Sequence, residues 1–266
     1  MFFSSFRKYA LFFNAGVKHE LSNLNFLLVR TVFYVFLIFV YNRMWLAIGS
    51  DTQVPGLTPL TATWYLAIAE ALYFCVPFSN VPKIEEDVKN GQYIGFLSKP
   101  ISYNGLTFFE LLGGYVIRQP VFLTLAFLLA WLITGGIPDN VVLMPLILVF
   151  YLLSAIINIF FILIIGLCYF FTYDTRNALL IYTKCCLILG GILYPLDIYP
   201  EWMVIMSKAT PFYAMIYLPT RMIYRTPNVS EVLEVLALLL FWIIVMGGSL
   251  FFVQRALQKK MTVSGG

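Results

Sequence analysis

Long apolar runs separated by short polar segments dominate the chain. Six runs, at 26–48, 61–81, 106–133, 141–171, 178–194 and 232–253, contain few charged residues. About 20 apolar residues are enough to cross the hydrocarbon core of a bilayer as an α-helix. The runs are continuous rather than alternating, which indicates helices and not the strands of a barrel. The pattern therefore predicts an all-α integral membrane protein with six transmembrane helices, the second kinked at Pro77.

The first 24 residues have a different periodicity. Phe6, Tyr9, Phe13, Val17 and Leu21 follow one another at spacings of three and four, with basic residues between them. Such spacing gives a helix with one apolar and one basic face, which suits the membrane–water interface. We predict an N-terminal amphipathic interfacial helix over 1–24; the alternative is a solvated start of the first span.

The segment 195–225 also departs from the spanning pattern. Its apolar stretches, 201–209 and 212–218, are too short to cross a bilayer, and prolines bound both of them. Six tyrosine and tryptophan residues between 194 and 224 are typical of a membrane interface. We expect a short re-entrant helical hairpin in the outer leaflet, between the fifth and sixth transmembrane helices.

Glycine doublets recur within the spans, at 113–114, 190–191 and 247–248. Small residues allow helix backbones to approach one another closely. Close helix packing is therefore the favoured interpretation of these doublets, and gating flexibility is the second.

Charge decides the expected orientation. With an internal N-terminus, the cytoplasmic basic residues are Arg7, Lys8, Lys18, Arg30, Lys83, Lys89, Lys99, Arg176, Arg255, Lys259 and Lys260. The outer set is only Arg43, Lys208, Arg221 and Arg225. Basic residues concentrate in cytoplasmic loops, so both termini are predicted to be cytoplasmic. The net charge of +4 is what such loops produce and does not indicate nucleic acid.

Catalytic motifs are absent from the sequence. His19 is the single histidine, no GxxxxGK[ST] phosphate loop occurs, and all four cysteines fall inside apolar runs without zinc-ligand spacing. We therefore expect no enzyme activity, no metal site and no cofactor in this chain. Any energy from ATP has to come from another polypeptide.

A few polar residues within the spans are the remaining candidates. Glu70, Arg118, Asn158 and Lys184 each cost a few kcal/mol at mid-bilayer unless they are paired or face water. Lys184, like Glu110, lies near a predicted inner end, where snorkelling explains it. Glu70 and Arg118 lie deeper, and we expect them to form a structural pair or to line a translocation route.

Two stretches, placed in this topology, resemble a known family. Residues 89–102 read KNGQYIGFLSKPIS, and residues 191–202 read GILYPLDIYPEW, followed by TPF at 210–212 and YLP at 217–219. Together with the interfacial helix, six spans and outer hairpin, they resemble the permease subunits of bacterial type-2 ATP-binding-cassette exporters. Each motif alone is modest, and the resemblance covers nearly the whole chain.

The resemblance implies partners and roles. The cytoplasmic loop 82–105 would contact a separate dimeric ATPase subunit, which would bind ATP and Mg²⁺. A second permease subunit, identical or paralogous, would complete the translocation pathway. The complex would lie in the bacterial cytoplasmic membrane. The implied ATPase contacts are Ile84, Glu85, Glu86, Asp87, Lys89, Asn90, Gly91 and Gln92, with a second contact at Asp174 and Arg176. The implied outer gate comprises Pro195, Asp197, Trp202, Pro211 and Phe212.

Three other functions remain open. An ion-coupled secondary transporter needs a carboxylate relay, for which only Glu70 and Glu110 are available, and usually an inverted repeat, which the sequence does not show. A membrane-embedded transferase needs an Asp/His or paired-carboxylate set, which one histidine and scattered acids do not supply. A passive membrane scaffold needs no motifs. Stoichiometric co-purification of an ATPase would distinguish the exporter from all three.

Overall fold

A computed structural model describes the backbone of residues 2–22, 24–49, 54–97, 99 and 101–264, and the side chains of 7–22, 31–49, 54–96, 99 and 101–259. Within these ranges the chain is all-helical. The main helices are α1 (Phe2–Ser22), α2 (Leu24–Ile48), α3 (Pro59–Cys75), α4 (Asn80–Lys89), α5 (Gln92–Leu97), α6 (Tyr103–Thr134), α7 (Met144–Thr172), α8 (Arg176–Leu189), α9 (Glu201–Lys208), α10 (Leu218–Thr220) and α11 (Val229–Ser264). Short η helices are η1 (Asp139–Leu143), η2 (Leu196–Ile198), η3 (Tyr213–Tyr217) and η4 (Arg221–Ile223).

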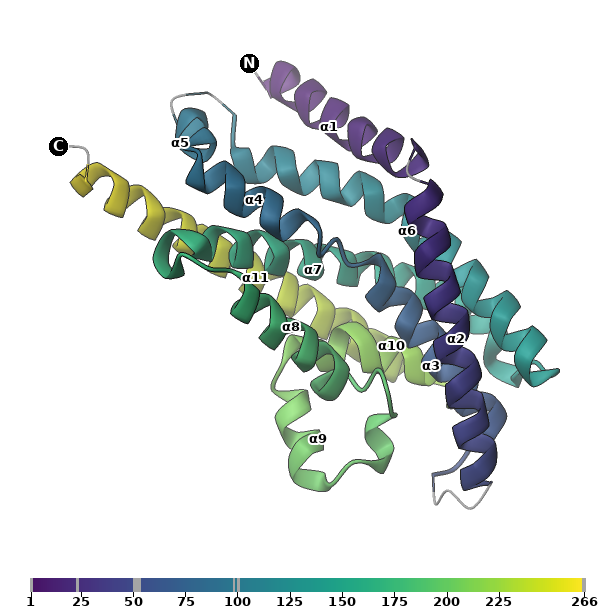
Figure 1. The fold of residues 1–266 in the computed structure, drawn as a ribbon. Coiled ribbons are helices and arrows are strands. Elements are labelled where there is room, and N and C mark those ends of the chain that lie inside the picture. Colours follow the sequence, from purple (N-terminus) through teal and green to yellow (C-terminus); the bar gives the residue numbers. More distant parts are fainter. Residues whose placement is uncertain (1, 23, 50–53, 98, 100, 265–266) are drawn as a thin grey trace.

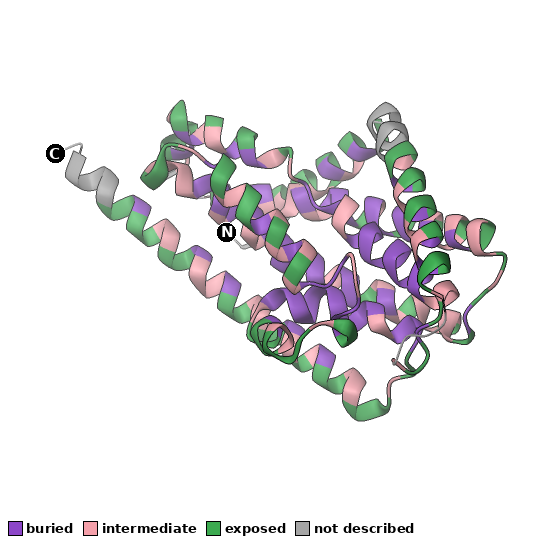
Figure 2. Cartoon of the chain, turned by 60° about the horizontal axis from the view of Figure 1, so that its bottom comes forward, coloured by how far each residue is buried: buried purple, intermediate pink, exposed green. Residues whose placement is uncertain are grey.

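The long helices form a bundle with two polar ends. Helix α1 lies along the first half of α6, and the helices α4 and α5 lie near the same end (Figure 1). Helix α9 and the short helices around it lie at the opposite end. Buried residues fill the centre of the bundle, while α11 carries exposed residues along most of its length (Figure 2).

Helix α3 is the core of the bundle. Every residue from Ala62 to Leu72 is buried, so apolar side chains surround this helix on all sides. Its start is set locally: Thr58 caps it through the backbone N–H of Thr61, and Pro59 occupies the first turn. The helix ends at Cys75, two residues before Pro77, since a residue preceding proline is disfavoured in helical conformation. Pro77 therefore ends this helix rather than kinking it, and a new helix, α4, follows.

Five stretches of the described chain are long and apolar enough to span a membrane: Thr31–Ile48, Pro59–Lys89, Tyr103–Thr134, Asp139–Thr172 and Val229–Lys259. The expected fifth span, 178–194, is not among them. Helix α8 ends at Leu189, because Gly190 and Gly191 follow and Gly191 has a φ of +66°. At about 1.5 Å per residue, a 14-residue helix covers about 21 Å, less than the hydrocarbon thickness. By length and composition the described chain therefore has five candidate spans, and the predicted span at 178–194 does not qualify on its own.

Glycine explains how α1 packs on α6. A Cβ on Gly16 would lie 1.9 Å from the carbonyl oxygen of Glu110, and a Cβ on Gly113 would lie 2.1 Å from the carbonyl oxygen of Phe13. The two backbones therefore touch, as the doublet at 113–114 predicted. Tyr9, from the predicted apolar face, packs on Phe109 with ring centroids 5.2 Å apart. Leu21, predicted on the same face, is instead 55% exposed.

The other two doublets differ. A Cβ on Gly190 would lie 2.4 Å from the carbonyl oxygen of Cys186 and 2.6 Å from the side chain of Ile216. A Cβ on Gly247 would make only ordinary contacts, and Gly248 faces open space. Close packing therefore accounts for the first two doublets and not for the third.

Replacing Gly113 with alanine is expected to destabilise the protein, because the new methyl group would collide with the backbone of α1. Overpacking of this kind costs about 1–3 kcal/mol. Thermal unfolding in detergent measures the effect as a lower melting temperature. Gly248→Ala is the matched control, expected to be neutral or slightly stabilising, because alanine favours helix more than glycine does. Equal melting temperatures for Gly113→Ala and the wild type would contradict the packing.

Candidate functional site

Helix α4 forms an amphipathic ridge at one polar end of the bundle. Val81, Ile84 and Val88 are buried at spacings of three and four, while Glu86 and Lys89 are exposed. Ile84 sits directly on Gly166 of α7, where a Cβ would lie 2.6 Å from its side chain. The absent side chain at Gly166 therefore lets α4 approach α7 closely.

Three polar bonds fix the orientation of α4. The hydroxyl of Thr175 donates to the carboxylate of Glu85, and the hydroxyl of Tyr103 donates to Asp87 over 2.6 Å. Lys83 donates to the carboxylate of Glu110 over 3.0 Å. These partners come from α6 and from the turn before α8, so α4 is bonded to two other parts of the bundle. The exposed Lys83–Glu110 ion pair adds little to stability by itself. Together the three bonds fix the orientation of α4.

The turn between α7 and α8 lies beside α4. Tyr173 adopts the left-handed conformation at a φ of 58°, which ends α7. Asp174 accepts from the backbone N–H of Arg176 over 3.0 Å, and the Arg176 side chain is 92% exposed. A groove of about 410 Å³ runs between the turn and α4, lined by residues that include Glu86, Lys89 and Arg176. The two cytoplasmic contacts predicted from sequence thus form one continuous surface.

The remaining residues of the first predicted contact lie at the end of α4. Asn90 and Gln92 are exposed, and Gly91 has a φ of +72°, which lets the chain turn from α4 into α5. The motif found at 89–102 continues through α5, and its residues Ser98 and Pro100 lie outside the described residues.

The polar candidates within the bundle do not form the expected set. Arg118 lies 3.4 Å from Glu20 of α1, so its partner is not Glu70. Glu70 is 3% exposed on α3 and makes no ion pair within the described part of the chain. Asn158 is buried and accepts from the hydroxyl of Tyr182. Lys184 is exposed on α8.

The predicted outer hairpin is built from α9, η3, α10 and η4. Pro200 precedes α9, and the neighbouring Trp202 is 62% exposed. Pro195 and Pro211 are buried, and Phe212 stacks on Phe161 of α7 with ring centroids 5.4 Å apart. The segment therefore has one part that packs on the core and one part, α9, that projects from it.

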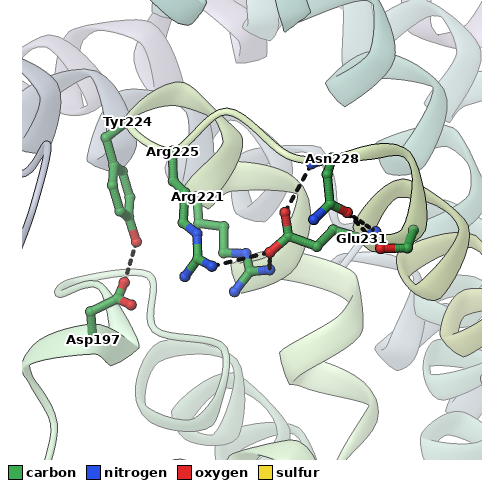
Figure 3. Close-up of polar contacts among 7 residues, drawn as sticks. Asp197, Arg221, Tyr224, Arg225, Asn228 and Glu231 are labelled. Carbon is green, nitrogen blue, oxygen red and sulfur yellow. Dashed lines mark hydrogen bonds and ion pairs between the residues drawn. The ribbon is translucent and has the colours of Figure 1, made fainter.

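Polar contacts close this end of the bundle (Figure 3). The hydroxyl of Tyr224 donates to Asp197, linking η2 to the chain after η4. Burial raises the pKa of Tyr224 well above its usual value, so the hydroxyl keeps its proton and remains a donor. Arg221 and Arg225 converge on one carboxylate oxygen of Glu231, at 3.4 and 3.2 Å.

Glu231 also belongs to the start of α11. Its other oxygen accepts from the backbone N–H of Asn228 over 2.9 Å, and the Asn228 side chain accepts from the backbone N–H of Glu231 over 2.8 Å. This reciprocal capping box satisfies two N–H groups that the first turn leaves free. The same glutamate thus starts the last spanning helix and holds the two arginines that precede it.

Sequence reasoning missed four of the partners. Glu20, Tyr103, Thr175 and Glu231 bond to predicted site residues or close the outer end, and none was singled out. Only Glu231 carried a recognisable signal, because Asn228 lies three residues before it as in a capping box. The others are joined by long-range folding. Among the described residues, no group of three His, Cys, Asp or Glu side chains is placed to hold a metal ion.

A family profile described as "ABC-2 family transporter protein" matches residues 29–264. A search of curated proteins finds no match.

Tyr224→Phe is expected to loosen the outer end, because it removes the donor to Asp197. A hydrogen bond to a charged group contributes about 1.5–3 kcal/mol. Hydrogen–deuterium exchange should therefore be faster in residues 195–210 of the variant. Tyr173→Phe, at an exposed tyrosine on the opposite polar end, is the control and should leave this exchange unchanged. Unaltered protection of residues 195–210 in Tyr224→Phe would show that the bond does not hold the segment.

Proposed function

Because the chain belongs to the ABC-2 family of transporter proteins, a family of multi-pass membrane subunits that are not themselves catalytic, we propose that it is the permease subunit of an ATP-driven exporter. In this proposal it forms half of the translocation pathway. A separate ATPase dimer binds ATP and Mg²⁺ and supplies the energy.

The observation that carries the proposal is the joined surface of α4 and the turn at 174–177. The exposed side chains of Glu86, Lys89 and Arg176 line one groove of about 410 Å³. Behind this surface, α4 is bonded to α6 and to the turn before α8 and packs on α7. A displacement of α4 by a bound partner would therefore move the spanning helices as well. Closure of an ATPase dimer would produce such a displacement.

The distribution of basic residues supports a cytoplasmic position for this surface. Lys83, Lys89 and Arg176 lie at the α4 end of the bundle, and Arg221 and Arg225 lie at the other end. The cytoplasmic side of a membrane carries the excess of basic residues, which supports a cytoplasmic α4 end and cytoplasmic termini. We place the protein in the bacterial cytoplasmic membrane as part of the same proposal.

Helix α8 supplies the sixth crossing together with the segment that follows it. The helix is too short to span alone, and the chain continues through η2 before α9 begins. In the proposal, 195–225 dips into the outer leaflet as a re-entrant hairpin. Ser154 and Tyr151 of α7 bond the irregular η3–α10 segment, which meets the need of non-helical backbone for internal partners.

The outer hairpin then acts as the external gate. Its attachment is polar at Asp197 and Glu231 and aromatic at Phe212. Rocking of two permease subunits would open and close the route between these segments. Exposed apolar residues on α2, including Val32 and Phe36, offer a face for the second subunit, identical or paralogous, or for membrane lipids.

One observation favours a second function. Glu70 is a buried carboxylate without an ion pair in the described part of the chain, as a proton-coupled secondary transporter would need. Glu110, the other carboxylate considered, is paired with Lys83 at the polar end and gives Glu70 no relay partner.

Glu86→Lys is expected to release the ATPase subunit, because it reverses an exposed charge on α4 that makes no bond within the described bundle. Co-purification from the native membrane, followed by native mass spectrometry, measures the loss; we expect two permease and two ATPase subunits for the wild type and about tenfold less ATPase for the variant. Glu201→Lys makes the same charge change at the other end and is the control. Full ATPase retention by Glu86→Lys would refute the α4 surface as the docking site.

Glu70→Gln is expected to leave proton permeability unchanged if transport is driven by ATP alone. Proteoliposomes loaded with a pH-sensitive dye report proton entry under an imposed gradient. Glu234→Gln, at an exposed carboxylate near the start of α11, is the matched control. Proton flux in the wild type that disappears only in Glu70→Gln would favour the secondary transporter.

A further inference from the structure

A second polar cavity lies where α1, α4 and α6 meet, separate from the groove on the exposed side of α4. Its volume is about 380 Å³, and its lining includes four charged side chains, Glu20, Lys83, Glu110 and Arg118. Each of the three helices contributes at least one of them. The cavity lies at the α4 end of the bundle, where α1 runs along the first half of α6 (Figure 1).

The four charges form two ion pairs of different depth. Lys83 and Glu110 are 3.0 Å apart and partly exposed at the rim. Arg118 and Glu20 are 3.4 Å apart with about nine-tenths of each side chain buried. Charged groups at this depth need partners for all their donors and acceptors.

The buried pair is incompletely bonded. The Nε–H of Arg118 forms no hydrogen bond with any described group, although it faces the Glu20 carboxylate. The guanidinium has five N–H donors and one carboxylate beside it. Arg118 also lines the cavity, so its guanidinium borders a space large enough for a small polar group.

Glycine keeps the cavity open. A Cβ on Gly114 would lie 3.2 Å from Nη2 of Arg118 and 3.5 Å from the carboxylate of Glu20. Gly114 is also a lining residue, so any side chain there would fill the space beside the buried pair. The absence of a side chain at Gly114 of α6 therefore leaves space beside the Arg118 guanidinium.

The lining charge indicates what the cavity takes. Two cations would attract an anion, but two carboxylates would repel it, so a simple anion gains little. A group that carries one positive and one negative charge satisfies both: its anion lies between Arg118 and Lys83, and its cation lies between Glu20 and Glu110.

The exposed apolar residues of α1 indicate where such a group comes from. Helix α1 lines the cavity through Gly16 and Glu20, and it exposes Leu11 (59%), Phe12 (38%) and Leu21 (55%). These side chains suit contact with acyl chains, as on any interfacial amphipathic helix. We propose that the α1–α4–α6 cavity binds the ammonium–phosphate headgroup of a zwitterionic phospholipid of the phosphatidylethanolamine type. This lipid site does not depend on ATP-driven transport. If the α4 end is cytoplasmic, as proposed above, the bound lipid belongs to the inner leaflet.

Lipid retention by the purified full-length protein tests the site. After delipidation, native mass spectrometry follows rebinding of phosphatidylethanolamine, phosphatidylglycerol and phosphatidylcholine added in equal amounts. We expect phosphatidylethanolamine to bind at least tenfold more tightly than phosphatidylglycerol, which lacks the ammonium group, and more tightly than phosphatidylcholine, whose quaternary ammonium cannot donate hydrogen bonds.

Two variants link the binding to the cavity. Lys83→Gln removes the rim cation, and Gly114→Ala fills the space beside Arg118 without changing charge. Both are expected to weaken phosphatidylethanolamine binding about tenfold. Arg43→Gln, an exposed basic residue outside this cavity, is the control and should bind as the wild type does. The melting temperature of each variant without added lipid shows whether it is folded.

Three results would overturn the proposal. They are equal binding of phosphatidylethanolamine and phosphatidylglycerol, unchanged binding by both folded cavity variants, and displacement of the lipid by glycerophosphoethanolamine at equal concentration. The last would mean that a soluble headgroup, rather than a membrane lipid, is the ligand. Loss of ATPase co-purification in Glu86→Lys is read independently, so failure of this site and failure of the permease proposal are distinguishable.

Discussion

Tyr65, at the centre of α3, donates its hydroxyl to the carbonyl oxygen of Gly191 over 2.6 Å, across 126 positions of sequence. That carbonyl follows the end of α8, and the residue four positions further on is Pro195, which has no N–H to donate to it. In a hydrocarbon environment a backbone carbonyl without a partner costs several kcal/mol, so a helix can stop inside the membrane only where another element supplies a donor. The buried helix α3 meets this need, because its Tyr65 hydroxyl is the donor to Gly191.

The same requirement recurs around α7. Ser154 donates to the carbonyl of Met215 over 3.0 Å, and the hydroxyls of Tyr151 and Thr220 lie 2.6 Å apart. These bonds hold the irregular η3 and α10 segments against a regular helix. Further along α7, Gly166 receives Ile84 of α4. From Ser154 to Gly166 is twelve residues, or about 18 Å of rigid helix. Helix α7 is thus the physical link between the α4 surface and the outer segment.

Helix α1 is joined to this framework differently. It touches α6 backbone to backbone at Gly16 and Gly113, and a single buried ion pair, Glu20 with Arg118, fixes its register. A cavity with charged walls lies beside that pair, so a ligand bound there would contact α1 and α6 together. A lipid headgroup there would bridge α1, α4 and α6, and would couple the bilayer to the surface on which an ATPase is proposed to dock.

The sequence by itself determined the parts of this protein that follow from local periodicity. The all-helical membrane class, the amphipathic α1 and the proline-bounded short helices near 201–218 can be read from residue spacing, because burial in lipid or at an interface repeats every three to four residues. The two stretches at 89–102 and 191–202 pointed to the family that the profile over 29–264 shows. Prolines and glycines mark where helices stop, although the prediction that Pro77 kinks a span was wrong, because α3 ends before it.

Only the tertiary structure decided which residues meet. Arg118 pairs with Glu20 rather than Glu70, Thr175 bonds Glu85, and α4 joins the 174–177 turn in one surface. These contacts join residues up to about a hundred positions apart, and a single sequence carries no signal for such pairs. The glycine pair marks the end of α8 in the sequence, but its bonding partner Tyr65 lies far away in the chain and was not predicted. Hydropathy determines which segments enter the membrane. Hydrogen bonds from distant residues to free backbone groups determine where a helix can end within it.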